Sequence, residues 1–198
     1  MAEPELWLIR HGETEWSRAG RHTGVTEVPL TPAGEDQARR LGEVLAGLRF
    51  DRVLCSPRLR ARHTAELAGL LPFEVVDDLR EWDYGEFEGQ TTADIQDGIP
   101  GWSIWDGPWN GGETADSVGA RADRVVDELL ASGAQRVALV GHGHFSRVLA
   151  ARWAGAPPSA GRWLYLDTAT ISALGWDRHG PVVLRWNLPA SWVAAAEA

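Results

Sequence analysis

Three apolar segments of the sequence end in basic or nucleophilic residues. The residues at these ends are Arg10, His11, Arg60, His142 and His144. Arginine forms charge-assisted, bidentate bonds to phosphate oxygens, and a neutral imidazole can attack phosphorus. A second imidazole, if protonated, can donate to a non-bridging oxygen while charge develops there. These residue types together predict phosphoryl transfer, which depends mainly on positioning and charge stabilisation.

A metal site is an alternative for the last of these three ends. His142 and His144 are spaced H-x-H, as two metal ligands on one strand can be. No third ligand is evident, however, and Arg10 and Arg60 would repel a cation. The sequence therefore predicts a site without a metal.

A leaving alkoxide also needs a proton, and the segment LREWDYGEFEG offers two donors. Glu81 and Asp83 both follow the third predicted strand, and either carboxyl group could act as a general acid. Trp82 and Tyr84 would supply an apolar wall that raises the pKa of such an acid. The residues alone leave the choice between the two carboxylates open.

Strand-like and helix-like segments alternate around these residues. Short apolar runs typical of strands cover 5–10, 51–57, 73–76, 136–142, 168–176 and 182–188. Segments typical of helices cover 30–48 (with Thr31 as N-cap), 58–71, 114–132, a short stretch near 91–97 and one from Phe145 or Ser146. This alternation indicates an α/β domain with a mostly parallel sheet. Ligands bind at the carboxyl ends of such strands, so the three strand ends can converge.

Length, composition and charge are those of one ordinary globular domain over residues 1–198. The chain is 44% hydrophobic and 24% charged, and its net charge of -9 argues against binding to nucleic acid or anionic membranes. The N-terminal apolar stretch is too short for a signal peptide or a membrane span. The single cysteine, Cys55, forms no internal disulfide and is expected to be buried. We therefore predict a cytoplasmic protein.

Ordered segments of the chain resemble the histidine phosphatase superfamily, also called the phosphoglycerate mutase-like family. LIRHGETEW is similar to its signature, CSPRLRARHTAE to its S-P-x-x-R-A-x-x-T-A segment, and LREWDYGEFEG to its L-x-E-x-x-x-G-x-x-E-G element. GGET followed by VALVGHGHFSRVL is similar to its late G-G-E-S and V-x-H-G elements. The resemblance covers most of the chain. It implies a three-layer α/β/α sandwich and a reaction without a cofactor.

The resemblance also implies a role for each candidate residue. His11 would become phosphohistidine, while Arg10 and Arg60 would bind the phosphoryl group. His142 would be the second histidine of the pocket. Glu81 would be the proton donor, which decides between the two carboxylates.

The segment expected to cover the pocket, residues 82–113, indicates a hydrolase. Mutases of the family hold a second phosphate or carboxylate with extra basic residues, but no Lys or Arg occurs between Arg80 and Arg121. Trp16 is followed by Ser17, where the family's mutases typically have Asn. We therefore expect a lid-like segment and a metal-independent phosphomonoesterase for small phosphate esters, either sugar phosphates or a broad range. Phosphoglycerate mutase activity is the alternative.

Similar segments occur in bacterial acid phosphatases, including mycobacterial ones, and in sedoheptulose-bisphosphatase-like phosphatases. The substrate-binding residues expected around this pocket are Ser17, Thr23, Gly24, Gly143, His144 and Trp105. Trp102 and Trp105, three residues apart, would fit one face of a helical turn, where they either anchor the segment or form a wall against substrate. Exposed late strands or tryptophans would support a homodimer, which stays open here.

Overall fold

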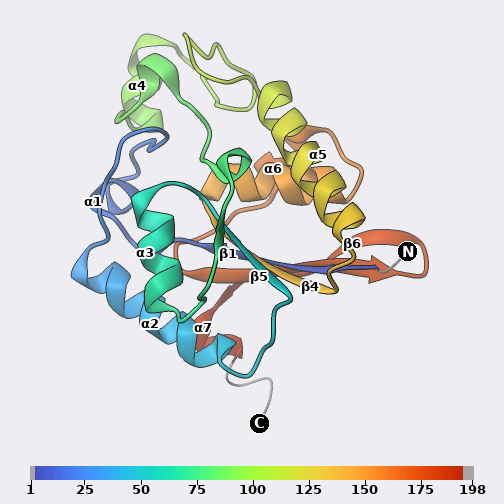
Figure 1. The fold of residues 1–198 in the computed structure, drawn as a ribbon. Helices are drawn as coiled ribbons and strands as arrows, with labels where there is room; N and C mark the ends of the chain where they lie inside the picture. Colours follow the sequence, from blue (N-terminus) through green and yellow to red (C-terminus); the bar gives the residue numbers. More distant parts are fainter. Residues whose placement is uncertain (1–2, 194–198) are drawn as a thin grey trace.

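Six strands form one sheet in the computed structural model, which describes residues 3–193 (Figure 1). The strands are β1 (Glu5–Arg10), β2 (Arg52–Cys55), β3 (Glu74–Val75), β4 (Arg136–Gly141), β5 (Thr170–Asp177) and β6 (Gly180–Pro189). Their order across the sheet is β3-β2-β4-β1-β5-β6. The first four are mutually parallel, whereas β5 runs antiparallel to both β1 and β6. The predicted mostly parallel sheet is confirmed.

Helices cover both faces of this sheet, so the three-layer α/β/α sandwich is also confirmed (Figure 1). One layer contains α2 (Pro32–Leu45), α3 (Leu59–Leu67) and α7 (Ala190–Val193). The other contains α5 (Ala115–Ser132) and α6 (Gly143–Trp153). Two short helices, α1 (Glu15–Arg18) and α4 (Thr92–Gly98), lie beyond the carboxyl end of β1. The lid-like role of residues 82–113, which include α4, stays a prediction.

Side chains of β1 alternate between two hydrophobic clusters, one on each face of the sheet. Leu6 and Leu8 join the cluster beneath α5 and α6, whereas Ile9 joins the cluster beneath α2 and α3. A parallel sheet that is buried on both faces needs apolar side chains on both sides of its strands. Cys55 belongs to the second cluster, and burial raises the pKa of its thiol to about 12.

Two helix boundaries follow local signals that the sequence contains. Thr31 caps α2, because its Oγ1 accepts a hydrogen bond from the Gly34 N–H at 3.0 Å. The helix predicted over 58–71 ends earlier, at Leu67. Gly69 has a φ of +67°, and a left-handed glycine shortly after the last helical residue terminates a helix.

Three other local features differ from the predictions. Helix α6 begins at Gly143 rather than at Phe145 or Ser146, because a carboxylate from a distant segment caps its N-terminus. The strand predicted over 73–76 has only the two residues of β3. The short helix α1 follows β1 directly and was not predicted.

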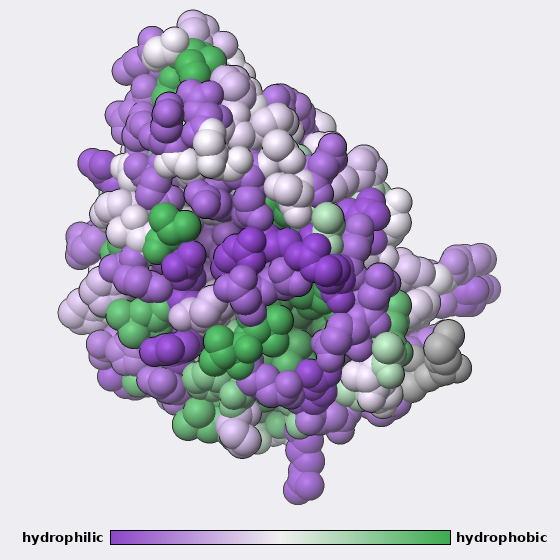
Figure 2. All heavy atoms as spheres, turned by 45° about the horizontal axis from the view of Figure 1, so that its top comes forward, coloured by the Kyte–Doolittle hydropathy of each residue, from purple (hydrophilic) through white to green (hydrophobic). Residues whose placement is uncertain are grey.

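The exterior is mainly hydrophilic on the face shown in Figure 2, where the largest group of hydrophobic residues lies below the centre and smaller groups lie near the top and on the left. The two apolar clusters lie beneath this surface. Within residues 3–193, no helix combines the length and the apolar character needed to cross a membrane.

Candidate active site

A pocket of about 500 Å³ opens where β1 and β4 end at the carboxyl edge of the sheet. Its lining includes Arg10, His11, Glu81, Gly143 and His144. Two of the three predicted strand ends, together with Glu81, therefore meet in one pocket. Arg60 and His142 lie deeper, with no exposed surface.

His11 is buried and has one nitrogen free for attack. Its Nδ1 lies 2.8 Å from the Gly12 carbonyl oxygen, which can only accept, so we assign the proton to Nδ1. The Nε2 atom then carries the lone pair. Burial, followed by the charges of Arg60 and Arg10, lowers the pKa of His11 well below 6.5. The imidazole is therefore neutral at pH 7, as a nucleophile must be.

His142 lies beside His11, with ring centroids 5.3 Å apart, and a serine hydroxyl contacts one of its ring nitrogens. The Ser56 Oγ lies 2.7 Å from the His142 Nε2 and can donate its proton there. Nδ1–H is then a donor. Burial, then the charges of Arg60 and His11, lowers the pKa of His142 well below 6.5. We therefore assign His142 as a neutral imidazole with its proton on Nδ1, in contrast to the protonated imidazole considered from the sequence.

The arginines of the pocket are oriented by backbone carbonyls. Arg10 donates from Nη1 to the Leu166 carbonyl, and Arg60 donates from Nη2 to the Thr23 carbonyl at 2.8 Å. Within the described part of the chain, the buried Nε atoms of Arg10 and Arg60 and the Nδ1 of His142 have no hydrogen-bond partner. Buried polar groups are rarely left unpaired, so these three nitrogens are available to bind an anion.

Glycines at two positions allow the site to close around His11. A Cβ on Gly12 would lie 2.3 Å from the Gly34 carbonyl oxygen, so the loop after β1 can pack against α2 only with glycine there. A Cβ on Gly143 would lie 3.2 Å from the Arg10 Cζ. The start of α6 therefore lies directly against the Arg10 guanidinium.

Glu81 is buried and lines the pocket, whereas Asp83 does not. Its Oε1 accepts hydrogen bonds from the N–H groups of Trp82 and Phe145, both at 2.9 Å. Its Oε2 accepts one, from the His144 N–H at 3.0 Å, and keeps a free lone pair. The carboxylate therefore caps α6 and presents one oxygen with spare capacity.

An uncharged polar cluster lies beside Glu81. The Tyr84 hydroxyl and the His144 Nδ1 are 2.7 Å apart, and the rings of Tyr84 and His22 are 4.7 Å apart. Burial lowers the pKa of His22 to about 4 and that of His144 well below 6.5, and it raises the pKa of Tyr84. Without carrying charge, these groups can donate hydrogen bonds to a leaving group and accept hydrogen bonds from it.

Most residues expected to bind substrate line the pocket. They are Ser17, Thr23, Gly143, His144 and Trp105. Gly24 does not, because it lies behind Thr23, where its carbonyl accepts a hydrogen bond from Arg60 at 3.2 Å.

Trp102 and Trp105 both line the pocket and both pack into the core. Trp102 contacts Phe87 and His22, and Trp105 contacts Trp82 and His144. The helical turn expected for them is wrong, since residues 104–106 form a turn between the bridged residues Ser103 and Gly107 and Trp102 lies outside it. Trp102 and Trp105 can therefore anchor the segment and form a wall of the pocket at the same time. Trp109 packs against the core outside the pocket lining.

Arg147 and Arg21 also line the pocket, and sequence reasoning missed both. Arg147 stacks over the Trp105 ring at 4.7 Å and donates from Nε to the Gly161 carbonyl at 3.0 Å. It forms no ion pair with a carboxylate of residues 3–193. The pocket therefore contains further cations, although no Lys or Arg occurs between Arg80 and Arg121.

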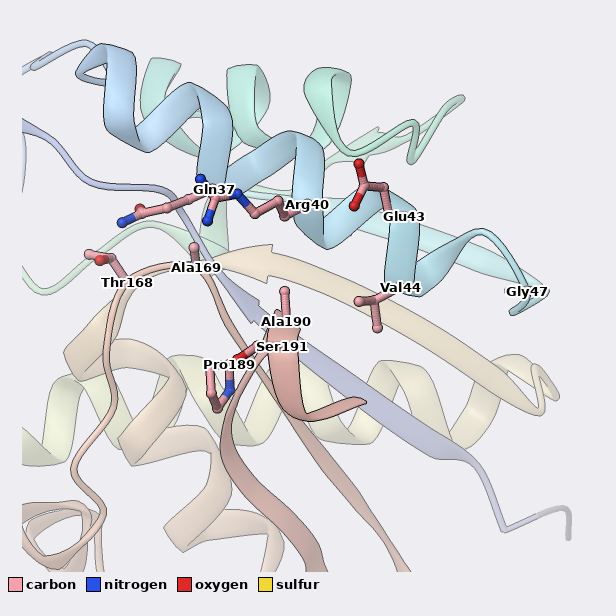
Figure 3. A pocket seen from close by; sticks show the side chains of 10 residues that line it. All are labelled: Gln37, Arg40, Glu43, Val44, Gly47, Thr168, Ala169, Pro189, Ala190 and Ser191. Atoms are coloured by element: carbon pink, nitrogen blue, oxygen red, sulfur yellow. The ribbon is translucent and has the colours of Figure 1, made fainter. Parts of the chain in front are cut away.

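A second hollow, of about 550 Å³, lies between α2 and the end of β6 (Figure 3). Its charged lining residues are Arg40 and Glu43, and it contains none of the strand-end residues. Among the described residues, no group of three or more His, Cys, Asp or Glu side chains is placed to hold a metal ion. The candidate active site is therefore the pocket around His11.

A comparison with protein families agrees with this geometry. The model of the histidine phosphatase superfamily (branch 1) matches residues 6–189. The chain belongs to the histidine phosphatase superfamily. The fold of this histidine phosphatase is therefore the one that the resemblance implied.

Several named relatives are phosphatases, and two others, each 30% identical over 199 residues, are named probable phosphoglycerate mutases. An acid phosphatase of Mycobacterium tuberculosis is 46% identical over 178 residues, which cover 88% of this chain and 87% of the relative. A sedoheptulose 1,7-bisphosphatase of Saccharomyces cerevisiae is 36% identical over 185 residues, which cover 77% of this chain and 68% of that relative. A solved structure of an open-reading-frame product from Mycobacterium tuberculosis superposes with a TM-score of 0.91, at 42% identity, covering 94% of this chain and 98% of that one.

The family and these relatives make this chain a phosphoric monoester hydrolase of the histidine phosphatase type, which acts on small phosphate esters. The phosphoglycerate mutase alternative has less support. The roles of individual residues are a separate question.

Proposed function

We propose that His11 is the nucleophile of a two-step phosphomonoesterase reaction that needs no metal. The observation that carries this proposal is the set of unpartnered buried nitrogens of Arg10, Arg60 and His142 beside a neutral His11. A phosphoryl group bound there would satisfy all three nitrogens at once. The Gly143 N–H, at the first position of α6, adds a further donor of the kind that binds phosphate.

In the first step the His11 Nε2 attacks phosphorus and the ester P–O bond breaks. The leaving oxygen takes a proton from Glu81, so the leaving group departs as an alcohol. In the second step Glu81, now a carboxylate, accepts a proton from water while the water oxygen attacks phosphohistidine. The P–N bond breaks, and inorganic phosphate and neutral His11 are restored. Arg10, Arg60 and His142 bind the phosphoryl oxygens throughout.

The test is phosphate release in the presence of a chelator. The substrates are nitrophenyl phosphate, phosphoglycerates, sugar mono- and bisphosphates and phosphoamino acids, with a coupled mutase assay in parallel. We expect hydrolysis at the same rate with and without chelator. A strict metal requirement would refute the metal-free mechanism, and phosphoryl transfer between phosphoglycerates without hydrolysis would favour the mutase.

We further propose that the preferred substrate carries a second anionic group. Arg147 and Arg21 give the pocket two cations beyond the phosphoryl site, in a chain with a net charge of -9. Arg147 is held in place by Trp105 and by the Gly161 and Arg162 carbonyls, so its guanidinium is preorganised. The bisphosphatase relative is named for a substrate with two phosphates.

Substitution Arg147→Met should therefore raise KM for a bisphosphate by about tenfold to a hundredfold, as expected for one charge-assisted contact. KM for nitrophenyl phosphate, which has one anionic group, should change little. Arg185→Met, on β6 outside the pocket lining, is the matched control. Equal losses on both substrates would mean that Arg147 only supports the backbone at residues 161–162.

The pH dependence of kcat/KM should follow the buried histidines. Because burial lowers the pKa of His11, the nucleophile stays neutral as the pH falls through 6.5. We therefore expect the acid limb of kcat/KM to lie below pH 6.5. The measurement uses nitrophenyl phosphate and is corrected for the second ionisation of the substrate's phosphate group, whose pKa is about 6. A limb centred at pH 6.5 that persists after the correction would contradict the lowered pKa of His11.

A cytoplasmic location and a homodimer belong to the proposal as well. The buried, unpaired Cys55 supports a reducing compartment. Trp163 and Tyr165 are 81% and 67% exposed, and β6 is an edge strand, which supports a second copy on this side. Light scattering at micromolar concentration should give twice the chain mass of 21.6 kDa. A single-chain mass would contradict the dimer.

A further inference from the structure

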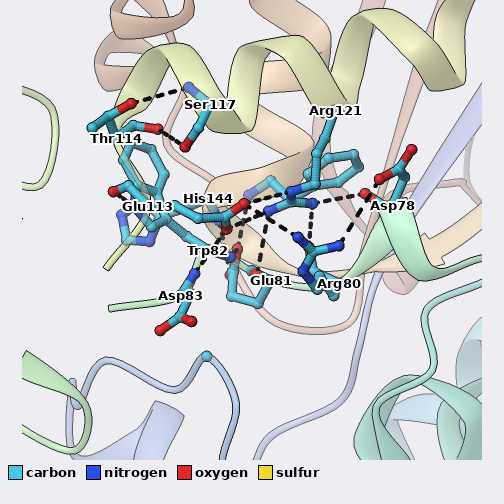
Figure 4. Close-up of polar contacts among 12 residues, drawn as sticks. Asp78, Arg80, Glu81, Trp82, Asp83, Glu113, Thr114, Ser117, Arg121 and His144 are labelled. Atoms are coloured by element: carbon cyan, nitrogen blue, oxygen red, sulfur yellow. Dashed lines mark hydrogen bonds and ion pairs between the residues drawn. The ribbon is translucent and has the colours of Figure 1, made fainter. Parts of the chain in front are cut away.

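Arg121 holds the backbone segment that carries Glu81. Its side chain, on α5, is almost completely buried. The guanidinium donates from Nη1 to the carbonyls of Asp78 at 2.7 Å and Arg80 at 3.0 Å, and from Nη2 to the Glu81 carbonyl at 3.5 Å. Figure 4 shows it reaching from α5 toward this segment. The backbone before Glu81 is therefore fixed to α5.

Glu113 holds the backbone on the other side of Glu81. Its carboxylate accepts a hydrogen bond from the Asp83 N–H at 3.0 Å, and its carbonyl accepts one from the Trp82 Nε1 at 2.7 Å. It also forms a bidentate pair with Arg121, with Oε1 to Nε at 2.8 Å and Oε2 to Nη2 at 2.7 Å (Figure 4). The two residues form one unit, which we call the Arg121–Glu113 clamp.

The clamp also contacts the start of α6. The Arg121 guanidinium lies over the Phe145 ring, 5.0 Å from its centroid. The Phe145 N–H is one of the donors to the Glu81 carboxylate. The clamp thus touches both the backbone of Glu81 and the helix turn that binds its side chain.

Both members of the clamp carry charge but lie outside the pocket lining. Burial alone would raise the pKa of the Glu113 carboxyl, but the hydrogen bond and charge of Arg121 more than offset this, so the pKa lies below its usual value. Replacing a buried ion pair by apolar residues often costs no stability. A contribution to the stability of the fold is therefore a weak explanation for the presence of the Arg121–Glu113 ion pair.

We propose that Arg121 and Glu113 are positioning residues that hold the Glu81 carboxyl group at the distance and angle needed to protonate the leaving oxygen. The inference rests on the proposed function, in which Glu81 is the general acid. Displacing an acid by a fraction of an ångström weakens proton transfer but leaves the phosphoryl site unchanged. Reactions that need little protonation should therefore be nearly unaffected.

The experiment compares kcat for an alkyl phosphate, which needs a protonated leaving group, with kcat for nitrophenyl phosphate, which does not. The variants are Arg121→Lys, which removes the bidentate fork, and Glu113→Gln, which keeps the size but removes the charge. We expect either to slow the alkyl ester about tenfold to a hundredfold, within the range of general acid catalysis. We expect the nitrophenyl ester to slow less than about threefold, as an order-of-magnitude estimate from the same principle.

The matched control is Arg152→Lys. Arg152 forms a bidentate pair with Asp123 between α6 and α5, with Nε to Oδ1 at 2.7 Å and Nη2 to Oδ2 at 3.1 Å, but it contacts neither Glu81 nor the pocket. Its ratio of alkyl to nitrophenyl rates should equal that of the wild type, even where its melting temperature falls.

Glu81→Gln is measured alongside as the reference. If it slows the alkyl ester selectively while both clamp variants slow the two esters equally, the clamp is only structural and the inference is overturned. If Glu81→Gln itself slows both esters equally, the acid role of Glu81 fails and the inference fails with it. If Arg121→Lys does not fold, Glu113→Gln decides the result, because it keeps the carbonyl that binds Trp82.

Discussion

Substitution of His11 by alanine is expected to lower phosphate release by at least about a thousandfold, which corresponds to roughly 4 kcal/mol of transition-state free energy. The reason is that no neighbouring group is placed to replace it. His142, the closest imidazole, has its Nε2 engaged by Ser56, and its Nδ1 is assigned as a donor. The loss should be the same for alkyl and nitrophenyl esters, because both need the nucleophile.

Two further measurements separate chemistry from folding and binding in this variant. Inorganic phosphate should still bind to His11→Ala in calorimetry, because Arg10 and Arg60 remain. Rapid acid or base quenching of the wild type with labelled substrate, followed by mass spectrometry, should place the phosphoryl group on His11. Activity close to that of the wild type in His11→Ala would refute the mechanism.

Glu81→Gln should slow alkyl phosphates by about a hundredfold or more, since general acid catalysis contributes roughly 10²–10⁴. Nitrophenyl phosphate should slow much less, because its leaving group departs without a proton. The glutamine oxygen can still accept one or two of the three N–H groups that bind Glu81, so the start of α6 keeps part of its cap. The decisive quantity is the ratio of the two rates.

Asp83→Asn is the matched control for the acid role. Asp83 lies two residues from Glu81, but its Oδ1 accepts a hydrogen bond from the Gly85 N–H at 3.0 Å and it does not line the pocket. Its ratio of alkyl to nitrophenyl rates should equal that of the wild type. Selective slowing of alkyl esters by Asp83→Asn, and not by Glu81→Gln, would reassign the acid.

Much of the fold and the strand-end residues could be predicted, because these features depend on local patterns. The apolar run before Arg10 and the cap residue Thr31 indicate their elements directly. The rule that ligands bind at the carboxyl ends of parallel strands then brings His11 and His142 together. Their tautomers could not be predicted, since these depend on Gly12 and Ser56 at fixed distances.

Features that depend on contacts between distant residues were missed or misplaced. Helix α6 begins early because Glu81, 62 to 64 residues before its first turn, accepts N–H groups there. Arg147 lines the pocket from α6. Its place there can be recognised only from its contacts with Trp105 and the Gly161 carbonyl, which the folded chain brings beside it. Neither contact leaves a periodic signal in the sequence.

The nitrogens of Arg10, Arg60 and His142 also connect anion binding to the stability of the fold. An anion that binds only the folded state stabilises that state by mass action. Inorganic phosphate, the product, is an anion of this kind. Accumulating product would therefore protect the folded chain against unfolding at the same concentrations at which it slows turnover.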